Sequence, residues 1–386
     1  GPGPNRMNET VVHQTSLAIA RYISSTNENP SVVIGYDARN KSDTFARLAS
    51  QVFLSEGVQV YEFPYIVPTP LLAHAVVRMN ASAGVMITAS HNPKQWNALK
   101  LLNYKGEFLN GQNGQKIIDA AANLSDLSYA NVDEAGTYTQ KDFKEAHINA
   151  ILNLSMVDVQ SIKNQKFKVA IDAVNSTGGI YIPALLEALG VENIYPIFCE
   201  PNGQFPHNPE PLPAHLSAII NEVKSKKADL GVVVDPDVDR LALVDENGEL
   251  FGEEYTLVAA ADYVLSENPG RNTVSNLSST RALRDVTEKH GGTYQASAVG
   301  EVNVVQKMKD TDAIIGGEGN GGVILPALHY GRDALAGIAL ILSHLAKSNI
   351  SASKLRSQYP NYTISKNKID LPSNISVDEV IMKVIN

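Results

Sequence analysis

Residues 83–93 read AGVMITASHNP, and this stretch decides the fold. The apolar run Ala83–Ile87 predicts a buried parallel strand, and the polar residues after it predict a turn. In open α/β sheets, ligands bind beyond the carboxyl ends of such strands. Ser90 therefore presents a hydroxyl nucleophile where chemistry is expected, with His91 beside it. The alternative is an ordinary turn in which both side chains cap neighbouring backbone groups.

Strand-like apolar runs alternate with amphipathic helical patterns in both directions from this stretch. The alternation predicts an α/β fold with parallel sheets rather than a sandwich or a helical bundle. The predicted strands are Ser31–Tyr36, Val58–Phe63, Ala83–Ile87, Lys168–Val174, Asp229–Val234, Thr273–Leu277 and Ala313–Ile315. The longest predicted helix, Asp333–Lys347, carries an apolar stripe.

These patterns group into three consecutive α/β units of common domain size. We expect domain I at residues 1–145, domain II at 146–248 and domain III at 249–361, and the pattern changes again over residues 362–386. The polar stretch Asp133–Lys141 predicts the first linker. The stretch Pro201–Pro213 contains five prolines and predicts a surface loop.

Composition narrows the class of partner. The chain has 386 residues and a net charge of −9, and its 32 basic side chains form no long run that could neutralise a nucleic-acid backbone. We therefore expect no nucleic-acid partner. No apolar stretch approaches the length of about 18 residues typical of a membrane span, so we expect no membrane partner either. The single cysteine, Cys199, fits a reducing compartment, which predicts a cytoplasmic protein.

Three carboxylates alternate in the segment Asp235-Pro236-Asp237-Val238-Asp239-Arg240, directly after a predicted strand. Carboxylates this close raise each other's pKa unless a cation compensates. Hard oxygen ligands, with a phosphate oxygen to complete the shell, favour Mg²⁺. A solvated acidic turn is the structural alternative. Calcium is the lesser metal, because the segment lacks the glycine and the distal glutamate of an EF-hand loop.

Lys100 and the segment Gly35–Arg39 offer further candidates. Lys100 could accept a proton from a sugar hydroxyl if nearby cations lower its pKa, although a lone lysine is more often a solvated surface residue. In the segment Gly35–Arg39, an aspartate and an arginine are expected to pair as a structural brace. That brace could hold the Ser90 turn in place.

The segment Gly316–Gly322 contains only one carboxylate and one amide among glycines. Glycines let backbone approach a ligand closely, and Glu318 can accept hydrogen bonds from two vicinal sugar hydroxyls. Arg332, a dozen residues later, is a candidate for pairing with phosphate. A glycine-rich turn with a solvated glutamate is the alternative.

Taken in this order, the motifs at residues 88–93, 235–240 and 317–322 resemble those of the α-D-phosphohexomutases. This family interconverts sugar 1-phosphates and 6-phosphates. The likeness runs from about Asn5 to the end of the chain. It implies three consecutive mixed or parallel α/β domains around a central cleft, followed by a fourth, α+β domain that residues 362–386 begin. It also implies hexose phosphates as small-molecule partners and a monomer or homodimer.

The resemblance also implies residue roles. Phosphoserine at Ser90 would give its phosphoryl group to the substrate, which becomes a sugar 1,6-bisphosphate. The bisphosphate would reorient in the cleft, and its other phosphate would return to Ser90. The implied catalytic residues are Ser90, Lys100, Arg240 and His91, the implied Mg²⁺ ligands are Ser90, Asp235, Asp237 and Asp239, and the implied substrate-binding residues are Gly317, Glu318, Asn320 and Arg332. The form Glu-Gly-Asn-Gly-Gly is similar to the phosphoglucosamine and phosphomannose/phosphoglucose mutase branch. Glucosamine phosphate is therefore the expected substrate, with mannose or glucose phosphate as the alternative.

Two family features are missing from the sequence: an amino-terminal Gly-(Ile/Leu)-Arg-Gly segment and a carboxy-terminal Arg-Pro-Ser-Gly-Thr phosphate loop. A truncated mutase whose cleft lacked that wall would lose its clamp on the non-reacting phosphate. We therefore expect little or no mutase turnover from these 386 residues, and family-like turnover in a coupled assay would refute this expectation.

Two other functions fit parts of the sequence. A phosphatase could use Asp235 as the nucleophile, because Asp-x-Asp after a strand can form an aspartyl phosphate. An acid-stable phosphate on Ser90 would favour the mutase, and a labile phosphate on Asp235 would favour the phosphatase. The third reading is a sugar-phosphate binding protein without catalysis, which would bind ligand and form no product.

Overall fold

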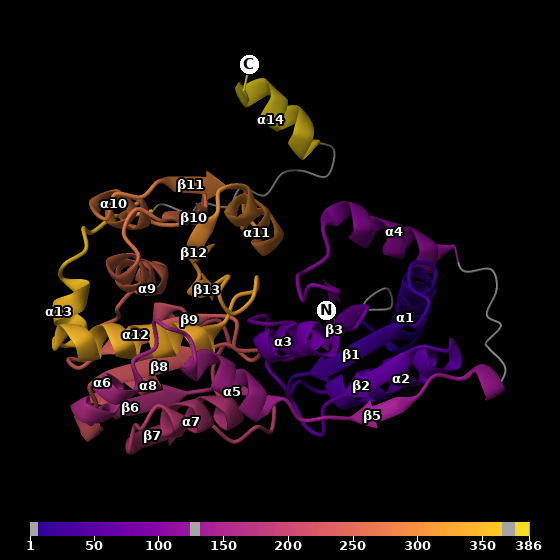
Figure 1. Ribbon diagram of the computed structural model, residues 1–386, viewed down its shortest axis with the longest axis horizontal. Coiled ribbons are helices and arrows are strands. Elements are labelled where there is room, and N and C mark those ends of the chain that lie inside the picture. The colour runs from indigo at the N-terminus through magenta and orange to yellow at the C-terminus, as the bar shows by residue number, and fades with distance from the viewer. Residues whose placement is uncertain (1–6, 124–131, 365–374, 386) are drawn as a thin grey trace.

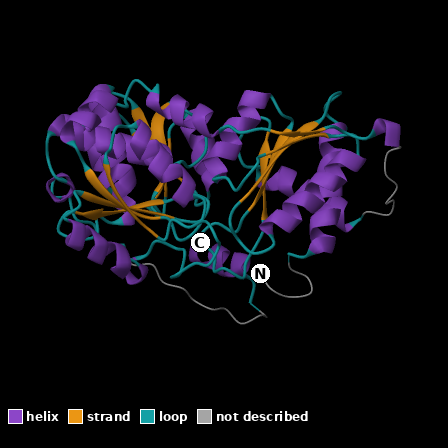
Figure 2. Cartoon of the chain, turned by 90° about the horizontal axis from the view of Figure 1, so that it is seen from below, coloured by secondary structure: helices purple, strands orange, loops and turns teal. Residues whose placement is uncertain are grey.

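The computed structural model describes residues 7–123, 132–364 and 375–385. Within these residues, three sheets are flanked by helices, which confirms the predicted α/β fold (Figures 1 and 2). No helix in this part of the chain has both the length and the apolar character needed to cross a membrane. The prediction of a changed pattern after residue 361 falls largely on residues 365–374, which lie outside the described part.

The first sheet has the strand order β4-β3-β1-β2-β5. Its strands are β1 (Ser31–Tyr36), β2 (Gln59–Glu62), β3 (Ala83–Ile87), β4 (Leu99–Asn103) and β5 (Tyr138–Gln140), and its helices are α1 (Glu9–Ser24), α2 (Ser42–Ser55), α3 (Thr69–Met79) and α4 (Gly111–Ala122). β1 runs parallel to β2 and β3, and β4 is antiparallel to β3. Val32 and Ile34 pack with α1 and α2 while Val33 packs with α3, because successive side chains of a strand face opposite sides.

One predicted linker contains a strand. Within the stretch Asp133–Lys141, a short 3₁₀ turn (Val132–Glu134) precedes β5, which pairs in parallel with β2 at the edge of the sheet. The linker prediction is therefore wrong for residues 138–140. The side chains of β5 are exposed, and pairing uses backbone groups, so an edge strand of this kind leaves no apolar pattern in the sequence.

The second and third sheets have the orders β7-β6-β8-β9 and β11-β10-β12-β13. The second consists of β6 (Lys168–Asp172), β7 (Asn193–Ile197), β8 (Leu230–Val234) and β9 (Leu241–Asp245), with α5 (Lys144–Leu152), α6 (Val159–Gln165), α7 (Gly178–Ala188), a 3₁₀ turn (Pro213–His215) and α8 (Ser217–Lys226). The third consists of β10 (Asn272–Asn276), β11 (Tyr294–Ser297), β12 (Ala313–Glu318) and β13 (Gly322–Ile324), with α9 (Glu253–Glu267), α10 (Ala282–Lys289), α11 (Glu301–Asp310), α12 (Ala334–Ser348) and α13 (Ala352–Arg356). The last described helix, α14 (Val377–Ile385), lies apart from this sheet (Figure 1).

The helix α12 connects the second and third sheets. Nearly all of its residues are buried, and it packs against α9, α6, β9 and β13 (Figure 1). The predicted apolar stripe therefore extends around most of the helix, as expected for a helix enclosed by other elements. One continuous hydrophobic core includes side chains of α3, α7, α9 and α12, so the three sheets share an interior.

The parallel strands β3 and β8 determine where the site lies. The Ser90 turn follows β3 and the aspartate segment follows β8, each at the carboxyl end of its strand. Thr69, the first residue of α3, donates its backbone N–H to the carbonyl oxygen of Asp237 at 2.9 Å. The first sheet is therefore attached directly to the aspartate segment of the second.

Candidate active site

The turn after β3 holds Ser90 in an uncommon conformation. Ser90 has a φ of 48°, in the left-handed region that costs a residue other than glycine about 1 kcal/mol or more. Its backbone N–H donates to Thr88 Oγ1 at 2.9 Å, and the Thr88 hydroxyl donates to Asp37 Oδ2 at 2.6 Å. The serine is buried, so these contacts fix the direction of its side chain.

Arg39 braces the same turn. The buried guanidinium pairs with Asp37 Oδ2 at 3.1 Å through Nε. Its remaining nitrogens donate to backbone carbonyl oxygens of the turn, those of Ser90, Asn92 (2.7 Å), Pro93 (2.9 Å) and Trp96 (3.1 Å). The predicted brace is confirmed, and it holds the serine turn through its backbone.

Replacing Arg39 by alanine should destabilise the protein strongly. The change leaves Asp37 buried without its cation, which typically costs about 3–5 kcal/mol. Urea unfolding measures the loss, and the exposed Arg47 in α2 offers a control, since Arg47→Ala should change the free energy of unfolding by less than about 1 kcal/mol. Equal effects of the two substitutions would contradict the brace.

The three aspartates after β8 lie together and are buried. One carboxylate oxygen from each of Asp235, Asp237 and Asp239 lies within 4.8 Å of the others. Asp235 Oδ1 accepts the backbone N–H groups of Asp239 and Arg240, each at 3.1 Å, and Val238 takes a φ of 59° to make this turn. The solvated acidic turn is excluded, because all three side chains are buried.

Ser90 meets this cluster directly. Its Oγ donates to Asp235 Oδ2 at 2.7 Å, a contact between residues 145 apart in the chain. Burial, together with Asp239 and Asp237, raises the pKa of Asp235 well above its usual range. Burial acts in the same direction on Asp239, but Arg332, Lys100 and Arg240 outweigh it and lower the pKa of Asp239. The cluster therefore combines strong mutual repulsion with cations on one side.

Lys100 supplies one of these cations. Its Nζ lies 2.7 Å from Asp237 Oδ2 and 3.2 Å from Asp239 Oδ2. Burial would lower the pKa of Lys100, but the two carboxylates outweigh it and place this pKa above the usual range. The expectation of a lysine pKa lowered by cations is therefore wrong here, because carboxylates are its closest charged neighbours.

The glycine-rich segment forms a hairpin between β12 and β13. Glu318 is the last residue of β12, and its oxygens already accept from Asn276 Nδ2 (2.8 Å), Arg332 Nη1 (2.9 Å), Asn320 Nδ2 (3.4 Å) and the backbone of Gly300 (3.3 Å). Gly317 admits the close approach of the opposite strand, since a Cβ there would lie 2.0 Å from the carbonyl oxygen of Gly322. Glu318 is therefore buried and bonded within the protein, which excludes the solvated glutamate that was the alternative.

Arg332 joins the glycine-rich hairpin to the aspartate cluster. Its three guanidinium nitrogens pair with Asp239 Oδ2 (2.6 Å), Glu301 Oε2 (2.8 Å) and Glu318 Oε2 (2.9 Å). The predicted role in pairing with phosphate would require one of these carboxylates to give way. Burial raises the pKa of Glu301 to about 7, against the opposing effect of Arg332.

Comparison with known proteins decides the family. Models of phosphoglucomutase/phosphomannomutase α/β/α domains I, II and III match residues 2–127, 145–248 and 252–362. The chain belongs to this family. The resemblance to the α-D-phosphohexomutases is thereby confirmed, and the protein is a phosphohexomutase, an isomerase that moves a phosphoryl group.

Relatives agree with this assignment. The mutase is 34% identical to the phosphoglucomutase/phosphomannomutase of Thermococcus kodakarensis, over 88% of this chain and 74% of that one. It is 29% identical to the phosphoglucosamine/phosphogalactosamine mutase of Sulfurisphaera tokodaii, over 98% and 84%. A crystal structure of a phosphoglucomutase/phosphomannomutase family protein from Burkholderia thailandensis superposes with a TM-score of 0.83 at 25% identity, covering 94% of this chain and 78% of that chain.

The proline-rich loop at residues 201–213 reaches the active site of the mutase. Glu210 Oε1 lies 3.3 Å from Arg240 Nη1, and Arg240 Nη2 lies 3.4 Å from His91 Nε2. Phe205 in the same loop packs 5.0 Å from the guanidinium of Arg39. Burial and Arg240 lower the pKa of His91. Sequence reasoning predicted only a surface loop, because composition does not show where a loop packs.

Glu210→Gln should slow phosphoryl transfer in the mutase about fivefold. The ion pair between Glu210 and Arg240 is partly exposed, so removing the charge of Glu210 should weaken the interaction that holds Arg240 in place by about 1 kcal/mol. The measurement is the rate at which the protein takes up phosphate from a hexose 1,6-bisphosphate. Glu200→Gln, at an exposed position before the loop, should leave this rate unchanged. A rate for Glu210→Gln equal to that of Glu200→Gln would show that the loop does not assist phosphoryl transfer.

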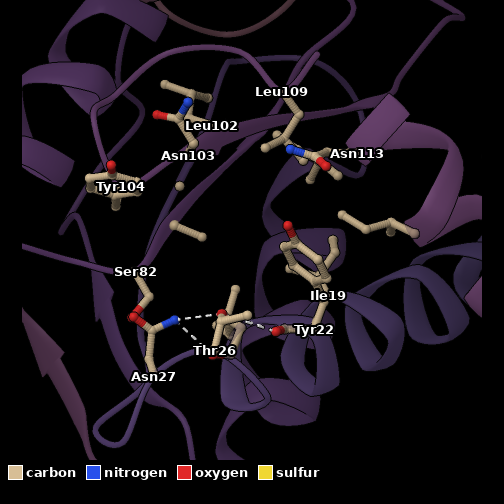
Figure 3. Close-up of a pocket in the computed structure, with 15 residues that line it drawn as sticks. Ile19, Tyr22, Thr26, Asn27, Ser82, Leu102, Asn103, Tyr104, Leu109 and Asn113 are labelled. Atoms are coloured by element: carbon tan, nitrogen blue, oxygen red, sulfur yellow. Dashed lines mark hydrogen bonds between the residues drawn. The ribbon is translucent and has the colours of Figure 1, made fainter. Parts of the chain in front are cut away.

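A separate cavity of about 330 Å³ lies in the mutase between α1, α4 and the strands β3 and β4 (Figure 3). Its lining residues include Ile19, Tyr22, Leu109 and Asn113, and none of them is an acid, a base or a histidine. Such a cavity offers no cation to a sugar phosphate.

Proposed function

We propose that Ser90 carries the phosphoryl group that the mutase exchanges with its sugar substrate. The 2.7 Å contact between Ser90 Oγ and Asp235 Oδ2 carries this proposal, because it brings a nucleophile and an acidic cluster from two sheets to one point. Mass spectrometry of the protein after incubation with a hexose 1,6-bisphosphate tests it. We expect an acid-stable phosphate on Ser90, and phosphate on other residues alone would contradict the proposal.

The aspartate cluster suits Mg²⁺. Asp237 Oδ1 and Asp239 Oδ1 are buried and have no hydrogen-bond partner, and such oxygens are costly unless a cation binds them. With one oxygen from Asp235 and one from the Ser90 phosphate, they offer the hard ligands that Mg²⁺ prefers. When bound, the ion would neutralise charge on the phosphoryl oxygens.

The remaining polar groups have roles in binding charge and moving protons. Arg240 Nε is buried without a hydrogen-bond partner, so it can donate to a phosphoryl oxygen on Ser90. Because Asp237 and Asp239 raise its pKa, Lys100 would donate a proton to the sugar oxygen that leaves, and it would accept one from the attacking hydroxyl only when a bound cation offsets these carboxylates. His91 would keep Arg240 in place, while Gly317, Glu318, Asn320 and Arg332 would bind the sugar after partial rearrangement of their present contacts.

Two transfers would complete the reaction. The Ser90 phosphate would pass to the free hydroxyl of a hexose phosphate, giving a sugar 1,6-bisphosphate, and the serine oxygen would recover a proton. The bisphosphate would then reorient in the site, and its other phosphate would be transferred back to Ser90. The bisphosphate is therefore both intermediate and activator, since it can phosphorylate a protein that has lost its phosphate.

We propose glucosamine phosphate as the preferred substrate. The Glu-Gly-Asn-Gly-Gly hairpin and the relative named phosphoglucosamine/phosphogalactosamine mutase support this choice, while the relative named phosphoglucomutase/phosphomannomutase supports the alternative. Rates of Ser90 phosphorylation with glucosamine, glucose and mannose 1,6-bisphosphates would distinguish them. Faster reaction with glucose or mannose would reverse the assignment.

The aspartyl-phosphate reading has less support. A phosphatase that used Asp235 as the nucleophile would leave Ser90 without a role, although its hydroxyl is buried and donates to Asp235 Oδ2. Membership of an enzyme family likewise disfavours a binding protein without catalysis.

A further inference from the structure

A second cluster of ligand-type side chains lies outside the proposed active site. His147 belongs to α5, His329 precedes α12, and Asp333 caps the start of α12. The Nε2 atoms of His147 and His329 lie 2.8 Å and 3.1 Å from the same oxygen, Asp333 Oδ2. All three side chains are buried, and one ligand atom from each lies within 4.8 Å of the others.

Hydrogen bonding alone leaves this cluster incompletely satisfied. Asp333 Oδ1 accepts the backbone N–H groups of Leu335 and Ala336, so only Oδ2 remains for two imidazoles. The Nδ1 atoms of His147 and His329 and the Nε2 atom of His74 are buried without a hydrogen-bond partner. Each buried polar group without a partner typically lowers the stability of the folded protein by about 1–3 kcal/mol. Hydrogen bonds therefore leave part of this buried cluster unsatisfied, while the two Nε2 atoms and Asp333 Oδ2 converge on one point.

We propose that His147, His329 and Asp333 bind a transition-metal ion of the zinc type, and that His74, whose ring lies beside that of His147 but outside the converging group, turns to complete the coordination shell. Two or three imidazoles with one carboxylate form a donor set that suits Zn²⁺, unlike the all-oxygen aspartate cluster. Imidazoles on a shared tetrahedral zinc ion place their ring centres about 5 Å apart. The ring centres of His74 and His147 are 5.3 Å apart, and those of His147 and His329 are 6.1 Å apart.

The ion would fix the elements that hold the aspartate segment. His74 lies in α3, whose first residue Thr69 donates its backbone N–H to Asp237 O at 2.9 Å. At the start of α12, Ala334 donates its backbone N–H to Val238 O at 3.2 Å. A metal bound by residues of α3, α5 and the start of α12 therefore holds three domains together behind the Mg²⁺ ligands. Its role is structural, because the hydrogen bonds of Ser90 involve Thr88, Asp235 and Arg39 and none of these ligands.

Cobalt substitution tests this site without reference to activity. The full chain, prepared without a histidine tag and stripped by a chelator, is titrated with Co²⁺. With excess Mg²⁺ present to occupy the aspartate cluster, we expect one ion per chain with the visible absorption of tetrahedral cobalt, and stoichiometric Zn²⁺ should displace it. Zn²⁺ should also raise the unfolding temperature, as any ligand of the folded state does.

Matched variants locate the ion. His147→Asn and His329→Gln, each checked for folding by circular dichroism, should lose the cobalt spectrum, whereas Asp235→Asn in the aspartate cluster should keep it. If a variant does not fold, the cobalt titration of the wild type alone tests whether the metal site exists. No tetrahedral spectrum in the wild type, or an undiminished spectrum in both folded histidine variants, would overturn the proposal.

Discussion

Ser90→Ala is expected to abolish uptake of phosphate from a hexose 1,6-bisphosphate and to lower any phosphoryl transfer by about 10³-fold or more. The alanine removes the hydroxyl that donates to Asp235, and the nearby Thr88 hydroxyl cannot replace it because it donates to Asp37 at 2.6 Å. The backbone turn should survive, since Arg39 holds it through carbonyl oxygens. Phosphate content by intact-mass spectrometry measures the effect.

A serine elsewhere in the first domain provides the control for this experiment. Ser55 ends α2, and its hydroxyl donates to the carbonyl oxygen of Val52, within the same helix. Ser55→Ala should therefore take up phosphate like the wild type. If Ser90→Ala takes up phosphate to the same extent, Ser90 is not the carrier, whatever the family membership.

Asp237→Asn is expected to weaken Mg²⁺ binding by about 100-fold. The substitution keeps the shape of the side chain but removes the charge from an oxygen that is buried without a partner. Mg²⁺ should raise the unfolding temperature of the wild type and leave that of the variant nearly unchanged at the same concentration. Isothermal titration calorimetry gives the two dissociation constants.

The control for this substitution is at the other end of the same strand. Asp229 is exposed just before β8, and its carboxylate accepts the backbone N–H of Lys168 at 2.8 Å. Asp229→Asn should retain the full response to Mg²⁺. A response of Asp237→Asn that matches Asp229→Asn would place the ion elsewhere.

Local patterns predicted much of the fold and of the main site. The strands Ser31–Tyr36 and Ala83–Ile87 have the predicted bounds, because continuous apolar runs between turn residues have few other structures available. The rule that ligands gather at the carboxyl ends of parallel strands placed Ser90 near the aspartates. The contact between Ser90 and Asp235 agrees with that prediction.

Contacts between domains could not be predicted. Thr69, Glu210 and Glu301 reach the site from a helix start, a loop and another helix start, and each owes its position to domain packing rather than to a local pattern. The raised pKa of Lys100 has the same origin, since its two carboxylate partners lie 137 and 139 residues away in the chain. The residues next to Lys100 in the sequence therefore did not show which charges surround its side chain.

The distance between the Ser90 phosphorus and the bound metal is the most direct test of this mechanism. Manganese can replace Mg²⁺ in the phosphorylated protein, and pulsed electron–nuclear double resonance then reports coupling between Mn²⁺ and ³¹P. A phosphoryl oxygen that completes the metal shell would hold phosphorus about 3 Å from the ion. Strong ³¹P coupling that Asp237→Asn abolishes is the predicted result, and a bound ion without coupling to the Ser90 phosphate would contradict the account.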